Sequence, residues 1–231
     1  MIGVIDYGAG NLGNVARALN YLNCRTRIIR EPADLSGIAG LVLPGVGSFA
    51  SGVEGLKQRE LFRPVKNYIF SGRPFLGICL GMQLLFQESR ENTGLRGLGA
   101  FPGRCEKFSP AEAGKVPHMG WNNLRVENKN SLLQQEEELY LYFVHSYYLP
   151  VNPKIVLAST VYGGQRFMSA VNWERVWGLQ PHPEKSGSRG LKILRNFVEV
   201  VNGDSNSRNR SKRGPGGPPD SGRFWATGDY E

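Results

Sequence analysis

The chain has 231 residues, with 30 glycines and 14 prolines, and 28 Lys and Arg against 20 Asp and Glu give a formal charge of +8 at pH 7. Glycine without a G-X-Y period excludes collagen, and no apolar stretch reaches the roughly 20 residues that a membrane-spanning helix needs. The three cysteines (Cys24, Cys79 and Cys105) lack the C-x-x-C spacing of a structural zinc site and are too few for a disulfide scaffold, so no metal is expected.

The start of the chain and the distribution of charge bear on location and partners. Met1 leads straight into an apolar run, Ile2–Asp6, without the basic and apolar regions of a secretory signal, so a cytoplasmic protein is expected. Most of the basic excess lies within residues 1–202 and forms no dense run. This distribution suits an anionic partner or substrate but does not favour nucleic acid, and no membrane association is expected.

The first half of the chain alternates strand patterns with helical ones. Short apolar runs predict strands, and apolar residues three and four apart predict amphipathic helices. The expected strands are Ile2–Asp6, Arg25–Ile29, Leu41–Leu43 and Pro74–Ile78. The expected helices are Leu12–Leu22, Leu61–Ile69 and Met82–Glu88. This alternation predicts an α/β fold whose parallel sheet carries helices on both faces.

The second half has short strand patterns separated by turn residues, which predict antiparallel additions to the sheet. The expected strands are Asn123–Val126, Leu139–Val144, Ile155–Val161, Met168–Asn172 and Val176–Gln180. A last helix carries apolar residues from Leu191 to Val201, so residues 1–202 are expected to form one domain with an open, mixed, mostly parallel sheet of the flavodoxin-like kind. Residues 203–231 are rich in Gly and Pro and almost free of aliphatic side chains, which predicts a disordered tail.

The segment Gly8–Gly13 matches G-x-G-x-x-G after a strand and before a helix, a pattern that brings a pyrophosphate close to a helix N-terminus. Glu31 lies near the position of a ribose-binding acid. The match is weak in a glycine-rich chain, because Asp6 and Tyr7 place a charge and a bulky ring where such fingerprints are apolar. A tight turn with another purpose is the favoured interpretation, and a dinucleotide site is the alternative.

The segment Gly77-Ile78-Cys79-Leu80-Gly81 lies between an expected strand and an expected helix. It has the form of a nucleophile elbow with cysteine in place of serine, in which flanking glycines permit a sharp, crowded turn. Cys79 would lie at a helix N-terminus, where the partial positive charge favours the thiolate. The alternative, a small buried core cysteine, does not explain the paired glycines. A nucleophilic Cys79 is therefore the favoured hypothesis.

A nucleophilic cysteine needs a base, and the chain has only three histidines: His118, His145 and His182. His182 follows the last expected strand, at the sheet edge where Cys79 is also expected, and Glu184 is two residues further on. A carboxylate at that distance can accept the imidazole N–H and fix the tautomer of the ring. A Cys79–His182–Glu184 triad is the hypothesis that uses these residues together.

These residues resemble the class I, or triad, glutamine amidotransferases. The matching segments are Pro44–Phe49, Gly77–Gln83 and His182–Glu184, and the resemblance covers roughly residues 1–202. It implies that Cys79 attacks the side-chain amide of glutamine, that His182 protonates the ammonia and then activates water, and that no cofactor takes part.

The resemblance also implies roles for residues around the nucleophile. The oxyanion donors would be the amide of Leu80 and an amide of the Val46–Gly47 loop, that of Val46 after a backbone rearrangement. Gly47, Gln83, Ser146 and Tyr147 would contact the α-amino and carboxylate groups of glutamine.

Three further segments, Asp6–Asn11, Pro117–Asn122 and Phe143–Tyr148, narrow the resemblance. They are typical of the members that form a heterodimer with a (β/α)8-barrel cyclase subunit and pass ammonia to it. On this resemblance the partner would meet Asn11, Asn14, Met119, Trp121 and Asn122. The alternatives are another triad glutaminase, for pyridoxal phosphate or anthranilate synthesis, a γ-glutamyl hydrolase, a dinucleotide-binding module and a catalytically silent adaptor.

Overall fold

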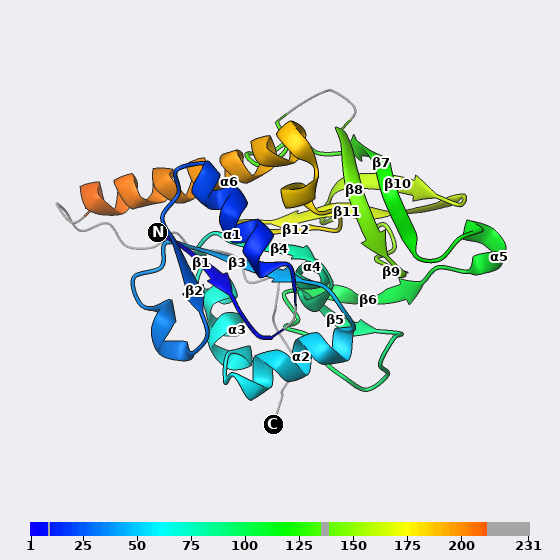
Figure 1. Cartoon of the computed structure of the whole chain (residues 1–231), viewed down its shortest axis with the longest axis horizontal. Helices are drawn as coiled ribbons and strands as arrows, with labels where there is room; N and C mark the ends of the chain where they lie inside the picture. The colour runs from blue at the N-terminus through cyan, green and yellow to red at the C-terminus, as the bar shows by residue number, and fades with distance from the viewer. Residues whose placement is uncertain (9, 135–138, 212–231) are drawn as a thin grey trace.

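The structure is a computed structural model that describes residues 1–8, 10–134 and 139–211 (Figure 1). Its main sheet has nine strands in the order β2-β1-β3-β4-β12-β11-β10-β7-β8. The parallel strands are β2 (Thr26–Ile29), β1 (Ile2–Ile5), β3 (Gly40–Gly45), β4 (Phe75–Cys79) and β12 (Val176–Leu179). The antiparallel continuation is β11 (Gln165–Trp173), β10 (Val156–Tyr162), β7 (His118–Val126) and β8 (Leu139–His145). The expected α/β fold class is confirmed.

Helices cover both faces of the parallel half of this sheet (Figure 1). One face carries α1 (Leu12–Tyr21) and α6 (Gly187–Ser211), and the other carries α2 (Phe49–Gln58) and α3 (Phe62–Phe70). Successive residues of β3 point to opposite faces, so Val42 packs with α1 and α6 whereas Leu43 packs with α2 and α3. Strands buried on both faces read as continuous apolar runs, which is why this half of the sheet was predictable.

A smaller sheet adjoins the site region, and one expected element there is wrong. It consists of β5 (Phe86–Ser89), β6 (Phe101–Lys107) and β9 (Tyr147–Tyr148). The helix expected over Met82–Glu88 is α4 (Leu80–Leu84), and the chain then enters β5. The apolar residues around Phe86 suit a buried helix or a buried strand, and pairing of β5 with β6 decides for the strand.

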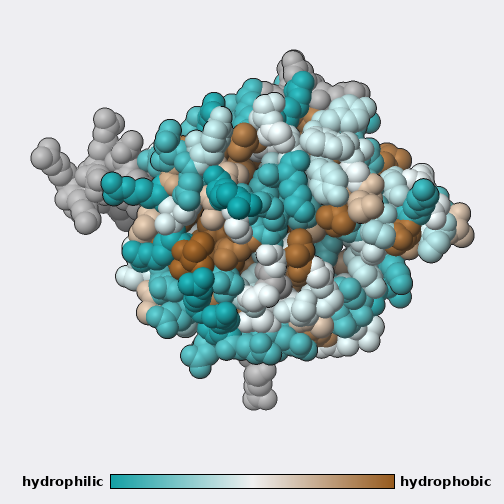
Figure 2. Space-filling view, in the orientation of Figure 1, coloured by the Kyte–Doolittle hydropathy of each residue, from teal (hydrophilic) through white to brown (hydrophobic). Residues whose placement is uncertain are grey.

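The remaining elements are short. They are the helix α5 (Pro110–Ala113) and the 3-10 turns η1 (Pro32–Leu35) and η2 (Pro183–Lys185). None of the described helices is both long and apolar enough to cross a membrane. Figure 2 shows a mainly hydrophilic face on which hydrophobic residues form small, separate groups.

The C-terminal helix α6 is longer than the expected last helix. It continues through Ser211. The expected disordered tail beginning at Gly203 stays a prediction. Once a helix has formed, each added residue gains a backbone hydrogen bond, and the helix can extend beyond its packed part. The rest of the expected tail, residues 212–231, lies outside the described residues.

Candidate active site

Cys79 ends β4 in a backbone conformation that most residues avoid, with φ of 55° and ψ of −110°. Both flanking glycines are needed for this turn. A Cβ atom at position 77 would lie 2.6 Å from the carbonyl oxygen of Gly81, and one at position 81 would lie 1.8 Å from the carbonyl oxygen of Leu43. Strain of this kind is held at functional sites by the surrounding structure. The elbow expected from the sequence is present.

The loop expected to form part of the oxyanion site lies beside this elbow. Gly45, the last residue of β3, pairs in register with Cys79, so residues 46 and 47 lie beside the nucleophile. Gly10 packs against the same loop, because a Cβ atom there would lie 3.1 Å from the Cα atom of Gly45. The glycine-rich turn after β1 therefore serves close packing of two backbone segments.

His182 and Glu184 form a buried pair. Nδ1 of His182 lies 2.7 Å from Oε1 of Glu184, and the two side chains are 1% and 0% exposed. Burial by itself lowers the pKa of His182, but the interactions with Cys79 and with the Glu184 carboxylate outweigh burial and raise this pKa to about 10. His182 is thus protonated at neutral pH, and Cys79 is one of the two residues that hold its proton.

The carboxylate of Glu184 has a second hydrogen-bond partner, Asn11, a residue expected from the sequence to meet a partner subunit. The side-chain amide of Asn11 donates to Oε1 of Glu184 at 2.5 Å. Asn14 donates to Asn11, and Arg17 donates to Asn14. Asn11 occupies the N-cap position of α1, but its side chain makes no capping hydrogen bond.

A pocket of about 250 Å³ opens over Cys79. It brings together residues expected to contact the oxyanion or the substrate, namely Gly47, Leu80, Gln83, Ser146 and Tyr147. Glu91 also lines it, and its carboxylate accepts the backbone N–H of Phe49 at 2.7 Å, at the start of α2. Sequence reasoning missed Glu91, because a single acidic residue in a loop carries no pattern.

A second residue missed from the sequence is Gln180. Its side chain is fully buried, and its amide nitrogen lies 3.8 Å from Sγ of Cys79. Its carbonyl oxygen accepts from the amide of Gln83 at 3.1 Å. The only signal in the sequence was its place two residues before His182.

The other two histidines form a buried pair that does not contact His182 by a hydrogen bond. Nδ1 of His118 lies 3.0 Å from Nε2 of His145, and Nδ1 of His145 lies 2.8 Å from the carbonyl oxygen of Tyr147. Burial lowers the pKa of His118 to about 4 and that of His145 to about 3, so both rings are neutral at physiological pH. The structure therefore leaves His182 as the base candidate.

The residues expected to meet a partner differ in their surroundings. Met119 and Trp121 on β7 are 66% and 57% exposed. Asn122, on the same strand, uses its amide within the chain, 3.2 Å from Nε2 of His118 and 3.1 Å from the carbonyl oxygen of Val161. Asn11 likewise has an internal partner, so these asparagines have structural contacts of their own.

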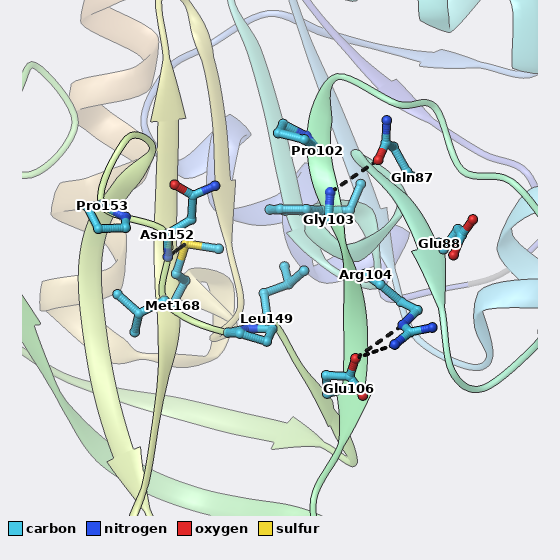
Figure 3. A pocket seen from close by; sticks show the side chains of 13 residues that line it. Gln87, Glu88, Pro102, Gly103, Arg104, Glu106, Leu149, Asn152, Pro153 and Met168 are labelled. Atoms are coloured by element: carbon cyan, nitrogen blue, oxygen red, sulfur yellow. Dashed lines mark hydrogen bonds and ion pairs between the residues drawn. The ribbon is translucent and has the colours of Figure 1, made fainter. Parts of the chain in front are cut away.

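Another cavity lies away from the elbow. It has a volume of about 520 Å³ and is lined by residues of β5, β6 and β11, among them Gln87, Arg104 and Met168 (Figure 3). Arg104 is paired with Glu106 there. Among the described residues, no group of three or more His, Cys, Asp or Glu side chains is arranged to hold a metal ion.

The dinucleotide alternative loses its structural basis. In such a site the third glycine lets the helix pack closely on the strand. Here a Cβ atom at Gly13 would meet no atom of another element within 4 Å among the described residues. Glu31 is exposed beside η1. The turn instead packs on the loop beside Cys79.

Comparison with known proteins identifies the family. The family model for class I glutamine amidotransferases matches residues 3–201. The chain therefore belongs to the class I glutamine amidotransferase family. Solved structures described as "Crystal structure of glutamine amidotransferase" and "Structure of PurLQS from Thermotoga maritima" superpose with TM-scores of 0.68 and 0.67, each covering 87% of this chain and 98% of theirs. Both are 20% identical, so they support the fold.

Curated relatives carry a narrower name, imidazole glycerol phosphate synthase subunit HisH. The protein of that name from Desulfitobacterium hafniense (strain DSM 10664 / DCB-2) is 45% identical over 206 residues, which cover 89% of this chain and 97% of the relative. That of Geobacillus thermodenitrificans (strain NG80-2) is 46% identical over 211 residues, covering 89% and 99%. That of Methanothermobacter thermautotrophicus is 44% identical over 204 residues, covering 87% and 99%.

Proposed function

We propose that this chain is the glutaminase subunit of imidazole glycerol phosphate synthase. It hydrolyses glutamine to glutamate and delivers ammonia to a cyclase subunit, which makes imidazole glycerol phosphate and an aminoimidazole carboxamide ribonucleotide in histidine biosynthesis. The observation that carries this proposal is the Cys79 elbow beside the buried His182–Glu184 pair. Relatives that are 44–46% identical and bear the synthase name support the choice of pathway.

The first half of the reaction uses the proton on His182. The Cys79 thiolate attacks the amide carbon of glutamine, and a bond forms between Sγ and that carbon. His182 then donates its proton to the amide nitrogen, the carbon–nitrogen bond breaks, and ammonia leaves a thioester on Cys79. Because Glu184 keeps its hydrogen bond to Nδ1, the proton is transferred from Nε2, the ring nitrogen that Glu184 does not hold.

The second half returns the enzyme to its starting state. Neutral His182 takes a proton from water, the resulting hydroxide adds to the thioester carbon, and the carbon–sulfur bond breaks to release glutamate and the Cys79 thiolate. In both halves negative charge develops on the former carbonyl oxygen. The amides of Leu80 and of Val46 or Gly47 would stabilise it, and each such donor typically contributes about 3–4 kcal/mol.

The pocket provides groups that suit the amino-acid end of glutamine. Both N–H bonds of the Gln83 amide are used, by the carbonyl oxygens of Tyr147 and Gln180, each at 3.1 Å. Its own carbonyl oxygen therefore remains to accept from the α-ammonium group. Glu91 would add a negative charge for the same group, and the Ser146–Tyr147 segment would face the carboxylate.

The exposed side chains of Met119 and Trp121 support a partner surface on β7. We propose that a (β/α)8-barrel cyclase docks there in a heterodimer, with Asn11, Asn14 and Asn122 at or near the contact, and that the complex works in the cytoplasm. Direct transfer keeps ammonia from escaping or becoming protonated in bulk water.

Glutamate release with and without the cyclase subunit and its nucleotide ligand tests the proposal. Cys79→Ala should abolish release, whereas Cys24→Ala, which changes a free cysteine outside the pocket, should leave it unaltered. Full activity in Cys79→Ala would contradict the triad. Release that the cyclase leaves unchanged would favour another triad glutaminase, such as one for pyridoxal phosphate or anthranilate synthesis.

A further inference from the structure

Gln180 is a buried amide directly against the nucleophile. It follows β12 at the sheet edge, is 0% exposed, and its backbone N–H is held by the carbonyl oxygen of Ser169 at 2.9 Å. Its side-chain nitrogen lies 3.8 Å from Sγ of Cys79, within the range of a hydrogen bond to sulfur. A buried amide is costly unless its polar atoms have partners, so its place here needs an explanation.

The orientation of this amide is fixed by its neighbours. Gln83 points its nitrogen at the carbonyl oxygen of Tyr147, at 3.1 Å, and a backbone carbonyl can only accept. The second N–H of Gln83 therefore donates to Oε1 of Gln180. Because Oε1 of Gln180 faces Gln83, the side-chain nitrogen of Gln180 is the atom that faces the sulfur of Cys79.

The carbonyl of Tyr147 is itself held in place. It accepts from Nδ1 of His145 at 2.8 Å, and Nε2 of His145 faces Nδ1 of His118 at 3.0 Å. A neutral imidazole that donates through one nitrogen accepts through the other. His118 therefore donates to His145, and His145 donates to the carbonyl oxygen of Tyr147. The amide of Gln83 donates to the same carbonyl oxygen.

We infer that Gln180 is a catalytic residue that donates a hydrogen bond to the Cys79 thiolate and aims the sulfur into the pocket. The inference rests on the proposed function, in which Cys79 is the nucleophile. In the neutral thiol, the S–H bond points to the carbonyl oxygen of Val144 at 3.8 Å. Ionisation removes that donor, so the sulfur then depends on donors from the protein. A donor to an ionised acceptor contributes more than a neutral pair, particularly where water is scarce.

Other groups also act on the sulfur and must be kept constant in a test. His182 before η2 carries a proton and interacts with Cys79. Tyr7 after β1 lies close enough for the charge of Cys79 to help raise the pKa of its hydroxyl, after burial as the main cause. His145 on β8 and Glu91 after β5 line the same pocket. Gln180→Met removes the donor without changing any charge.

Two variants distinguish the loss of the hydrogen-bond donor alone from the loss of the whole side-chain amide. Gln180→Met loses both polar atoms, whereas Gln180→Glu keeps an oxygen to accept from Gln83 but loses the donor to sulfur. Asn196→Ala is the matched control, since Asn196 is a buried amide that donates to the carbonyl oxygen of Leu132, away from the pocket. All are made in the full chain.

The first measurement is the rate at which iodoacetamide alkylates Cys79 as a function of pH, followed by mass spectrometry of the peptide that contains it. This readout keeps the half-exposed Cys24 separate. The midpoint of this pH profile should rise by about one pH unit in Gln180→Met. It should rise by more in Gln180→Glu, where a carboxylate faces the sulfur. Asn196→Ala should keep the wild-type midpoint.

The second measurement is glutaminase kinetics in the presence of the cyclase subunit and its ligand. Gln180→Met should lower kcat by about tenfold while KM for glutamine changes by less than about twofold. An unchanged alkylation midpoint in both folded variants would overturn the inference. Failure of the proposed function has a different signature, namely a wild-type chain that releases no glutamate. The alkylation midpoints decide the role of Gln180 in either case, since they need no turnover.

Discussion

The side-chain amide of Asn11 lies 2.5 Å from Oε1 of Glu184, although 173 positions separate the two residues in the chain. The same oxygen accepts the hydrogen bond from His182. The amide therefore restrains the carboxylate that orients the proposed base. Because Arg17 can only donate and a carboxylate can only accept, the two amides between them, Asn14 and Asn11, have one possible orientation.

Removing this amide should slow the chemistry and leave substrate binding unaffected. Asn11→Ala frees the Glu184 carboxylate from one of its two donors, and kcat should fall by about tenfold to a hundredfold, since a hydrogen bond to a charged group contributes roughly 1.5–3 kcal/mol. KM for glutamine should remain within about twofold, because Asn11 does not line the pocket. Steady-state kinetics of the cyclase complex provide the measurement.

Asn20→Ala is the control on the same helix, where the asparagine accepts from Thr26 on the surface. Its kinetics should match the wild type. A normal kcat in Asn11→Ala, or a loss that appears only as a raised KM, would exclude a role in holding Glu184.

The core of the fold was readable from sequence where burial on both faces produced continuous apolar runs, as in β1, β3 and β4. The helix α2 was not predicted, because Gly52 and Gly55 weaken both its helical propensity and its apolar pattern. A tertiary contact explains the glycine at position 55, where a Cβ atom would lie 2.4 Å from the backbone oxygen of Tyr7. Contacts of this kind leave no local trace in the sequence.

The candidate site likewise contains residues that local sequence patterns predicted and residues that only tertiary contacts define. Cys79, His182 and Glu184 were found because an elbow needs glycines on both sides and because a short chain segment carries both base and acid. Gln180 and Glu91 were not, because their roles arise from neighbours far away in sequence, Cys79 and Phe49. Asn11 was given to the partner surface, and its contact with Glu184 depends on how α1 and η2 pack.

The elbow glycines should be intolerant of any side chain. Gly81→Ala would place a Cβ atom 1.8 Å from the carbonyl oxygen of Leu43, which no rotamer change relieves. We expect the free energy of unfolding to fall by more than about 2 kcal/mol, as for other overpacked core positions. Urea denaturation followed by circular dichroism measures this loss.

Gly13→Ala is the opposite case in the same assay. The added methyl group meets no other element within 4 Å in the part of the chain that the structure describes, and the residue lies within α1. Alanine should raise the free energy of unfolding by about 0.5–1 kcal/mol, since glycine is the poorer helix former. Destabilisation by Gly13→Ala would mean that the third glycine of the motif has a packing role that the structure lacks.

The negative charge of Glu91 should favour substrate binding, and its carboxylate oxygen should stabilise the start of helix α2. Glu91→Gln retains an acceptor for the N–H of Phe49 but removes the negative charge from the pocket. KM for glutamine should rise by about tenfold or more, with little change in thermal stability. A glutamine titration of the glutaminase reaction and a melting curve measure the two quantities.

The neighbouring Asn92 supplies the matched control. It accepts from the N–H of Ala50 in the same helix turn, but it does not line the pocket. Asn92→Ala should lower stability by about 1 kcal/mol through the lost cap and leave KM unchanged. Equal KM values for wild type and Glu91→Gln would remove Glu91 from the substrate site.

The buried pair His118 and His145 should make the fold sensitive to mild acid. Their pKa values of about 4 and about 3 lie below the ordinary value of 6.5, and burial is the main cause. Between pH 6.5 and 4 the unfolded chain therefore binds more protons than the folded one, so stability is lost as the pH falls. Two histidines that behave in this way cost about 3 kcal/mol between pH 6.5 and 5.

The other titrating groups contribute little between pH 6.5 and 5. The pKa of His182 is raised to about 10, so the folded chain keeps this proton throughout the range, and proton uptake by the same residue in the unfolded chain offsets only a small part of the loss. The lowered pKa values of Asp6 and Glu127 act below their ordinary values near 4. Urea unfolding at pH 6.5 and 5 should thus report the pair, and His118→Gln, which removes one titrating ring, should reduce the difference by about half. A free energy of unfolding that is flat over this range would show that the two rings take up protons without leaving the core.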